Sequence, residues 1–392
     1  MSDATDALGD STLSPEVRRN LITVTTARLV ANACYRFSGP FLAIIASGLD
    51  ASLGEIGVAL AVSELTGLAS PAIGRMVDRA SHRASMAVGL AGTAVGCTIA
   101  AVSTSTTWFA LGVSFMVLTR QSFDIGLGAW IAAHVPYAQR GRIVGLTETS
   151  WALGLLVGVS LMGALTAVVG WRAGFGLGIV AVVVLCVVVV ARVNASPPSQ
   201  GYGHRRSGVR GRGWLIVAAM FALMTSAQCL FVTFGPWFNE RFGFDAARIS
   251  ALGFVLGAVE LLASTTSARR TDHWGKERSV ALGSLLIAPG ALLVVAGDAT
   301  VALAIAGTAL WLLGFEFAVV SMLPMATHLA PDSPGTGLGW VLGAGALGRA
   351  IAAVLATAAY ERIGIGGPAA IGVSCAVACA ILVAAHAACQ PR

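Results

Sequence analysis

Runs of about 20 apolar residues recur along the chain, and no other feature constrains its fold as strongly. A helix needs about 20 such residues to cross the hydrocarbon core of a bilayer. Each run is continuous rather than alternating and is longer than a barrel strand, so helices are the expected spanning element. We predict an all-α integral membrane protein with twelve transmembrane helices, at residues 21–47, 55–74, 84–104, 107–132, 143–168, 173–192, 214–238, 247–267, 279–297, 300–326, 336–358 and 367–388.

Charged residues are few, and their placement orients these helices. Only 11% of the 392 residues are charged, against about 25% in soluble domains, which excludes a soluble enzyme, a DNA-binding domain and a disordered chain. Of the 25 Lys and Arg residues, 17 fall on the side of the N-terminus and four on the opposite side. Because positive charge favours the cytoplasmic side, both termini are expected to be cytoplasmic. Lys276 is the single lysine, a composition typical of a GC-rich bacterial genome, so we expect a multi-pass protein of the bacterial inner membrane.

The spans divide into two groups of six. The longest connection on the side of the N-terminus contains Pro197, Pro198 and closely spaced arginines, which is typical of a linker. Asp78 follows the second span and Asp272 follows the eighth, so the two groups repeat each other. We predict a cytoplasmic tail (1–20), a six-helix bundle (21–193), a cytoplasmic linker (194–213), a second six-helix bundle (214–388) and a short cytoplasmic tail (389–392).

The connection after the second span carries a family motif. Residues 74–83 are similar to the Gly-x-x-x-Asp-Arg-x-Gly-x-Arg/Lys pattern of the major facilitator superfamily, with Ser81 at the second glycine. The resemblance covers essentially the whole chain and implies a transporter of two pseudo-symmetric six-helix bundles. In that family the loop is a cytoplasmic latch. The matching residues here are Gly74, Asp78, Arg79 and Arg83, with Asp272 as the counterpart in the second half. The family's acidic partner is absent, since residues 132–136 contain no carboxylate.

Glycines recur in the fifth span. Gly145, Gly154, Gly158 and Gly163 have a spacing similar to the antiporter motif of the same family, with Val159 in place of the family's proline. This resemblance implies export rather than uptake. Glycines at such spacing also let helices pack closely, so packing alone is the alternative interpretation.

Ionisable residues inside the spans are candidate functional residues, because a charge in the hydrocarbon core is costly. Spans 3, 6, 9 and 12 contain no Asp, Glu, Lys or Arg in their interiors, and these are the lipid-facing helices of the family that the chain resembles. We predict proton coupling at Glu64 and Asp124, with Arg120 modulating Asp124. The other charges are predicted to line a substrate cavity: Arg28, Arg36, Glu148, Glu260, Glu316 and Arg349.

Spacing and depth along the helices predict three ion pairs. A residue and the fourth residue after it share a helix face, and residues at equal depth on neighbouring helices are able to meet. Each pair is either part of the transport mechanism or a static salt bridge, and both interpretations stay open. The predicted pairs are Arg120 with Asp124, Glu316 with Arg349, and Arg28 with Glu148.

These features together predict a secondary transporter, not an enzyme, that works by alternating access. The expected activity is proton-coupled export of a small organic molecule, either drug-like or a metabolite. The alternative is an uptake symporter or uniporter for a small polar or anionic solute. The sequence contains no Walker loop or hydrolase motif, so the proton gradient is the expected energy source, with no cofactor and no metal site. We expect a monomer whose partners are its substrate and the lipid bilayer, without nucleic acid.

Overall fold

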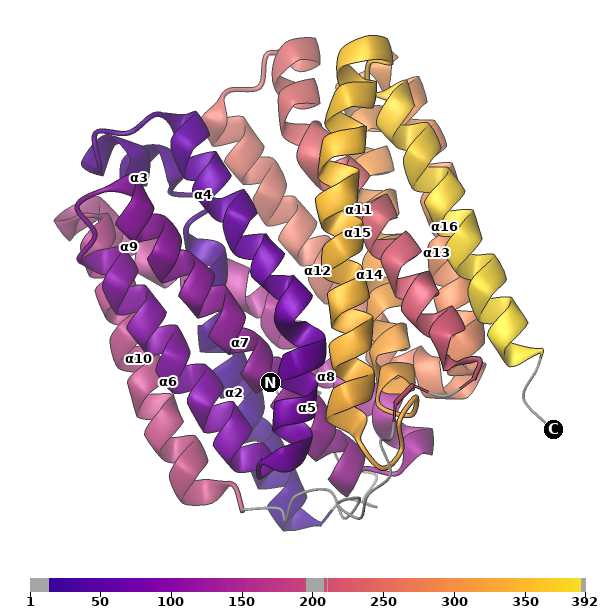
Figure 1. Cartoon of the computed structure of the whole chain (residues 1–392). Coiled ribbons are helices and arrows are strands. Elements are labelled where there is room, and N and C mark those ends of the chain that lie inside the picture. The colour runs from indigo at the N-terminus through magenta and orange to yellow at the C-terminus, as the bar shows by residue number, and fades with distance from the viewer. Residues whose placement is uncertain (1–13, 195–207, 210, 389–392) are drawn as a thin grey trace.

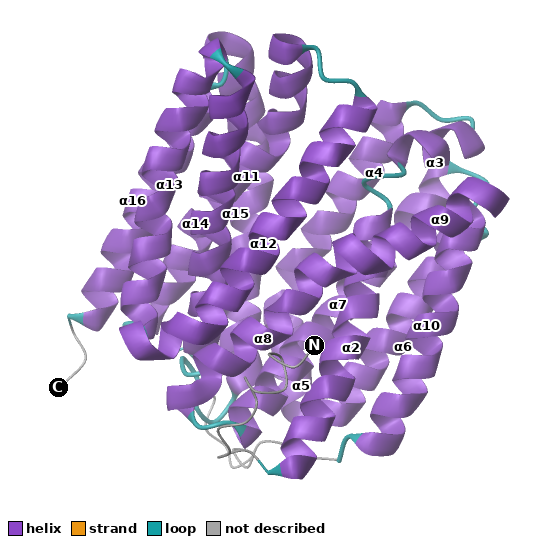
Figure 2. Ribbon diagram, turned by 180° about the vertical axis from the view of Figure 1, so that it is seen from behind, coloured by secondary structure: helices purple, strands orange, loops and turns teal. Residues whose placement is uncertain are grey.

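The structure is a computed structural model that describes residues 14–194, 208–209 and 211–388. Within these ranges every secondary-structure element is a helix (Figures 1 and 2). Most of the predicted N-terminal tail 1–20 and of the linker 194–213 lies outside the described residues, as does the tail 389–392.

The described helices form two halves that stand side by side (Figure 1). The N-terminal half contains α2 (Pro15–Phe37), α3 (Leu42–Gly48), α4 (Leu53–Leu65), η1 (Thr66–Ala69), α5 (Ser70–Arg79), α6 (His82–Ala101), α7 (Thr106–His134), η2 (Tyr137–Gln139), α8 (Arg140–Leu153), the π-helical turn η3 (Gly154–Val159), α9 (Ser160–Val169) and α10 (Trp171–Arg192). The C-terminal half contains α11 (Gly213–Phe242), α12 (Ala246–Trp274), α13 (Lys276–Ala296), η4 (Gly297–Ala299), α14 (Val301–Ala326), α15 (Pro334–Ile363) and α16 (Gly366–Ala387).

These helices account for the twelve predicted transmembrane spans. In the described ranges, ten helical segments are long and apolar enough to cross a membrane, and the bent pair of α2 and α3 makes an eleventh. The remaining span is α7, whose 29 residues exceed the length required but include the polar side chains of Arg120, Gln121 and Asp124.

Three spans of the N-terminal half are interrupted. The first bends by 61° between α2 and α3, where Gly39 and Pro40 lie and proline lacks the N–H that would continue the helix. The second changes to a 3₁₀ turn just before Pro71, at the start of α5. The fifth contains the π-helical turn η3, a feature that is frequent at functional sites.

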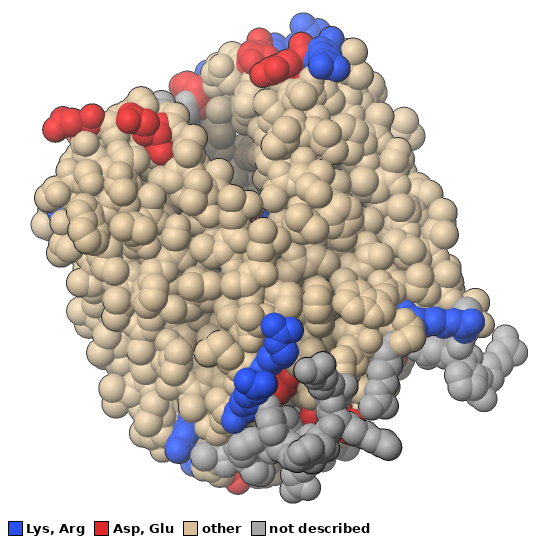
Figure 3. All heavy atoms as spheres, viewed as in Figure 1, with Lys and Arg blue, Asp and Glu red and all other residues tan. Residues whose placement is uncertain are grey.

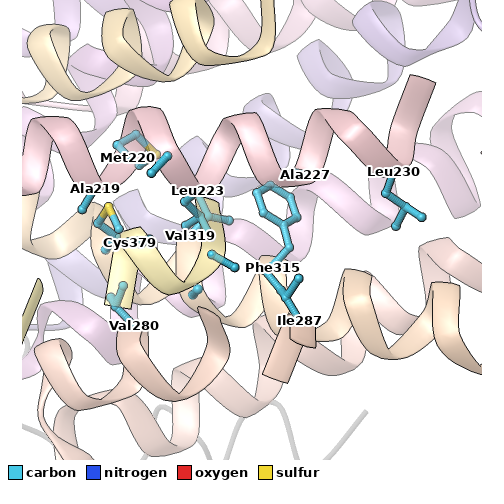
Figure 4. Packing of buried hydrophobic residues seen from close by; sticks show 14 of the residues in the cluster. Ala219, Met220, Leu223, Ala227, Leu230, Val280, Ile287, Phe315, Val319 and Cys379 are labelled. Carbon is cyan, nitrogen blue, oxygen red and sulfur yellow. The ribbon is translucent and has the colours of Figure 1, made fainter. Parts of the chain in front are cut away.

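Each half has its own hydrophobic core. The N-terminal core lies mainly between α2, α6, α7 and α10, and the C-terminal core lies mainly between α11, α13, α14, α15 and α16. Figure 4 shows the C-terminal core, where Leu223 of α11, Ile287 of α13, Phe315 of α14 and Cys379 of α16 pack together. Such packing holds membrane helices together in place of a hydrophobic driving force.

The outer helices present apolar side chains to the surroundings. Large apolar residues are exposed on α6, α10, α13 and α16, for example Val88, Val180, Leu292 and Ile381. These helices are the spans that the sequence shows to lack internal charge, and they lie at the outer edges of the two halves (Figure 1). In the face drawn in Figure 3, charged side chains gather towards the two ends of the molecule and leave a broad band with few charges between them.

Candidate functional site

A cavity of about 1120 Å³ lies between the two halves. Figure 3 shows the hollow between the halves at one end of the molecule, which we call the open face. The opposite end, where α2 begins and α16 ends, is called the closed face (Figure 1). Most of the lining is apolar, with aromatic side chains from both halves: Tyr35, Phe41, Trp151, Phe231, Phe234 and Phe254.

One ion pair in the cavity wall joins the two halves. The Nη1 atom of Arg36, on α2, lies 2.7 Å from Oε2 of Glu260, on α12, and Nη2 lies 3.3 Å from Oε1. The Arg36 guanidinium also stacks 4.6 Å from the ring centroid of Trp151 and donates to its carbonyl oxygen. A bidentate arginine pair of this kind fixes the geometry of both side chains.

A second ion pair also crosses between the halves. Arg349 Nη2, on α15, lies 3.3 Å from Oε2 of Glu64, on α4, and the hydroxyl of Tyr35 donates to the same carboxylate. The predicted pair of Glu316 with Arg349 is therefore wrong. Equal depth placed these two residues at the same level in the membrane, but their helices turn the side chains towards different neighbours.

A charge-balanced cluster lies within the N-terminal half. Arg120 Nη1 lies 2.6 Å from Asp124 Oδ2, as the four-residue spacing predicts. Arg28 Nε lies 3.1 Å from Asp124 Oδ1, and Arg28 Nη1 lies 2.8 Å from Glu148 Oε1, which forms the predicted pair of Arg28 with Glu148. Asn32 accepts a hydrogen bond from Arg120 at 3.2 Å. Two guanidinium groups thus neutralise two carboxylates.

Glu316 has a different environment from the other carboxylates. Its side chain is buried on α14, with a residue exposure of 5%, and it accepts a hydrogen bond of 3.3 Å from the Ser264 hydroxyl of α12. None of the ion pairs in the described part of the chain includes it.

The charged residues predicted around the cavity divide into two sets. Arg36, Glu260 and Glu64 line the cavity, whereas Arg28, Glu148, Glu316, Arg349, Asp124 and Arg120 are not among its lining residues. The second set is held in ion pairs or between packed helices. The described ranges contain no group of three His, Cys, Asp or Glu side chains placed to hold a metal ion.

At the closed face, Asp78 of the N-terminal half binds the start of α15 in the C-terminal half. Its carboxylate accepts hydrogen bonds from the backbone N–H of Gly335 at 2.8 Å, from that of Thr336 at 2.7 Å, and from the Thr336 hydroxyl at 2.6 Å. These donors form the first turn of α15, where backbone N–H groups lack partners within the helix and carry a partial positive charge.

Asp272 makes the equivalent contact from the C-terminal half. It accepts from the backbone N–H groups of Gly141 at 3.1 Å and Arg142 at 2.7 Å, in the first turn of α8, and Lys276 Nζ lies 2.7 Å from it. The sequence pairs Asp78 with Asp272 as repeats, but it does not reveal that each carboxylate binds the start of a helix in the opposite half.

The predicted motif residues around Asp78 and in the fifth span have distinct positions. Gly74 and Gly145 allow close contact across the seam between the halves. A Cβ atom on Gly74 would collide with the carbonyl oxygen of Gly335, and one on Gly145 would lie 2.5 Å from the backbone nitrogen of Ala268. Arg83 lies elsewhere, since it donates to the carbonyl oxygens at the end of α10.

The other glycines of the fifth span pack within the N-terminal half. Cβ atoms on Gly154 and Gly158 would contact Asn32 and Ala33 of α2, and one on Gly163 would lie 2.5 Å from the Phe41 ring. These glycines lie in or beside η3 and let it approach α2 closely.

The arrangement defines a class of protein. Two six-helix halves, with a cavity between them that is closed at one face by reciprocal contacts, form a membrane transporter rather than an enzyme. Residues 24–353 match the family model of the Major Facilitator Superfamily, and the chain belongs to this family.

Solved structures of low sequence identity share the fold. The human organic anion transporter MFSD10 (TETRAN) is 18% identical, with a TM-score of 0.78 over 94% of this chain and 100% of that chain. FucP in the outward conformation is 11% identical, with a TM-score of 0.76 over 93% and 98%. The proton:xylose symporter XylE is 13% identical, with a TM-score of 0.79 over 92% and 94%.

A relative from Bacillus subtilis (strain 168) matches part of the sequence. It is the uncharacterized MFS-type transporter YwfA, which is 26% identical over 134 residues. The match spans 34% of this chain and 32% of that protein.

Proposed function

We propose that the protein exports a small organic molecule in exchange for protons by alternating access. The proposal rests mainly on two ion pairs, Arg36–Glu260 and Glu64–Arg349, which join the two halves beside the cavity. The halves have to separate there or slide past each other when the cavity opens to the other side. A proton that neutralises one carboxylate weakens such a contact, which links proton binding to the conformational change.

Glu64, Asp124 and Arg120 are the proposed coupling residues. Glu64 lines the cavity, and its side chain has a relative solvent exposure of 35%, so protons have access to it. Protonation of Glu64 removes its attraction to Arg349. Asp124 pairs with both Arg120 and Arg28. Protonation of Asp124 would therefore leave an excess positive charge on these two arginines.

The closed face is the proposed cytoplasmic gate. In this role Asp78 and Asp272 hold the first turns of α15 and α8, and Gly74 permits the close approach that these contacts require. Arg79 and Arg83 are the basic residues of the same motif, with Arg83 securing the end of α10 beside the gate. The excess of Lys and Arg on this side of the membrane supports its assignment as cytoplasmic in a bacterial inner membrane.

The cavity favours an amphipathic substrate. Its volume of about 1120 Å³ is at or above the upper end of the usual range for small-molecule sites, roughly 300–1,000 Å³. Aromatic rings from both halves suit a flat apolar group, and the Arg36–Glu260 pair supplies both signs of charge. The glycine spacing of the fifth span, with the π-helical turn at its centre, supports export.

A symporter or uniporter for an anionic solute is the second candidate. Arg36 favours it, because its guanidinium lines the cavity and is able to exchange Glu260 for a substrate carboxylate. The fold is shared with an organic anion transporter and with a proton:xylose symporter, so it is compatible with this second candidate.

Transport assays in inverted membrane vesicles test the proposal. A panel of amphipathic cations, neutral drug-like compounds and organic anions is offered under an imposed proton gradient, acidic inside. We expect an amphipathic compound to accumulate inside the vesicles and the lumen to become more alkaline as it enters. Equilibration without accumulation for every compound would contradict proton coupling, and compound-dependent acidification of the lumen would indicate symport.

A further inference from the structure

The charges inside the spans do not balance. The predicted span interiors contain four arginines and five carboxylates. The ion pairs described above use every one of the arginines and four of the carboxylates: Arg28 with Glu148 and Asp124, Arg120 with Asp124, Arg36 with Glu260, and Arg349 with Glu64. Glu316 is the fifth carboxylate. A single proton on Glu316 makes the set electrically neutral.

The surroundings of Glu316 oppose a negative charge. The charged groups that act on it are Glu260 of α12, Glu148 of α8 and Arg36 of α2, and Arg36 is already paired with Glu260. The neutral hydroxyl of Ser264 is the hydrogen-bond partner of Glu316. Burying an ionised carboxylate without a cation is far more costly than burying the protonated acid.

A ladder of buried hydroxyls, interrupted between Ser264 and Ser267, lies between Glu316 and the closed face: Ser264 is bonded to Glu316, and Ser267, Ser321 and Thr271 are bonded to one another. Ser264, Ser267 and Thr271 lie on one stripe of α12, and each is fully buried. Ser321 of α14 joins them, since its hydroxyl lies 2.8 Å from that of Thr271 and 3.2 Å from that of Ser267. Ser267 and Thr271 are themselves 2.8 Å apart. At 1.5 Å per residue the stripe from Ser264 to Thr271 covers about 10 Å of depth.

The lower end of this ladder meets the gate. Thr271 precedes Asp272, whose carboxylate holds the start of α8, and a Cβ atom on Gly141 of α8 would lie 3.0 Å from Thr271 Cγ2. The start of α8 therefore covers the end of the ladder in this conformation.

We propose that Glu316 holds a proton while the cavity is open, and that the ladder of Ser264, Ser267, Ser321 and Thr271 conducts this proton to the closed face when the gate opens and water enters the turn between Ser264 and Ser267. The inference deepens the proposed function, since a proton site has a role in transport only if protons drive the cycle. Glu64 and Asp124 are paired with arginines in this conformation, whereas Glu316 is the carboxyl without a cation and, in this proposal, the one that carries the proton. Serine and threonine hydroxyls also stabilise contacts between membrane helices, and the test has to separate this role from proton transfer.

Infrared difference spectroscopy of the purified full-length protein tests the proton on Glu316 without substrate or gradient. At neutral pH we expect a carbonyl band of a protonated carboxyl that disappears in Glu316→Gln, persists in Glu361→Gln, which alters an exposed residue, and shifts in frequency in Ser264→Ala. Glu316→Asp is the second variant if the glutamine variant does not fold. An unchanged band in Glu316→Gln would show that Glu316 is ionised and would overturn the inference.

Deuterium exchange of the same band tests the ladder. In an Asp78→Ala background, which is expected to open the closed face, Thr271→Val is compared with Thr271→Ser. We expect exchange in the valine variant to be about 100-fold slower, the lower end of what a positioned proton-transfer group contributes. Equal rates in the two variants would reject the ladder as the route. Neither readout depends on transport, so a failure to accumulate substrate would count against the proposed function alone.

Discussion

Removal of the Asp78 carboxylate is the perturbation that most directly shifts the balance between the two faces. The Asp78 side chain binds two backbone N–H groups and one hydroxyl at the start of α15, at distances between 2.6 and 2.8 Å. When the halves separate, the Thr336 N–H keeps its bond of 3.0 Å to the Ser333 carbonyl oxygen, whereas the Gly335 N–H and the Thr336 hydroxyl lose Asp78 to water. Asp78→Ala therefore removes a contact that exists only while the closed face is shut.

The size of the effect follows from the number of contacts. A hydrogen bond to a charged group contributes a net free energy of about 1.5–3 kcal/mol. The bonds from the Gly335 N–H and the Thr336 hydroxyl alone, at the low end of this range, stabilise the shut conformation by about 3 kcal/mol. This free energy corresponds to about a 100-fold change in the ratio of shut to open molecules. Asp78→Asn keeps one acceptor oxygen but loses the charge, so we expect it to shift the ratio by about tenfold.

Distances between spin labels on the two halves measure this ratio. Arg192 at the end of α10 and Arg278 at the start of α13 are exposed at the closed face and suit the labels. In the wild-type background we expect a single short distance, and in Asp78→Ala a second, longer distance that becomes a major population.

Two further variants show whether the reasoning is right. Asp272→Ala removes the equivalent contact with α8, so we expect the same shift. Asp298→Ala removes an exposed partner of Arg241 at the open face, so we expect the label distance to stay unchanged. The reasoning is refuted if Asp78→Ala and Asp298→Ala give the same distance distribution.

Three other predictions follow from the same structure. Gly339→Leu should keep the closed face from shutting, because a Cβ atom there already collides with the carbonyl oxygen of Ser70, and the spin-label distance should then be long at every pH. Arg36→Gln should leave Glu260 buried without its cation, and we expect a loss of stability of about 3–5 kcal/mol in a detergent unfolding assay. Burial lowers the pKa of His328, and Arg140 and other nearby cations act in the same direction. The neutral imidazole therefore stabilises the shut conformation, and its protonation favours the open gate. Acidification from above the ordinary pKa of histidine should lengthen the label distance in the wild type, and should do so less in His328→Gln.

The membrane spans are the part of the fold that the sequence predicts best. Hydrophobic length determines where a helix crosses the bilayer, so the twelve spans agree with the described helices. The ends are less accurate. The eighth span was predicted to end at residue 267, whereas α12 continues to Trp274. The end of the apolar run marks where the helix leaves the hydrocarbon core. The helix itself continues through polar residues, and hydrophobicity does not mark where it stops.

The ion pairs show what spacing is able to predict. Arg120 and Asp124 lie four residues apart on one helix, where geometry alone brings them together. Arg28 and Glu148 were placed by depth, which was sufficient because α2 and α8 are neighbours. Depth does not specify which way a side chain faces around its helix, and for this reason Glu316 was assigned to the wrong partner.

Contacts between the two halves could not be predicted from the sequence. Arg36 with Glu260 and Glu64 with Arg349 join helices whose relative position is set by tertiary packing, and no spacing within the chain records it. The partner of Asp78 was missed for a related reason. A search for an acidic or basic partner overlooks the backbone N–H groups at the start of a helix, which are present at every helix whatever the sequence.

The balance point between the proton gradient and the substrate gradient tests the central claim most directly. Proteoliposomes are loaded with a compound that the vesicle assay identifies, and the substrate ratio that gives no net flux is measured at several imposed pH differences. For a proton-coupled exporter this ratio shifts in proportion to the proton gradient, with the compound driven opposite to the protons. A ratio that stays at one whatever the pH difference would contradict proton coupling, and a shift in the opposite direction would contradict exchange.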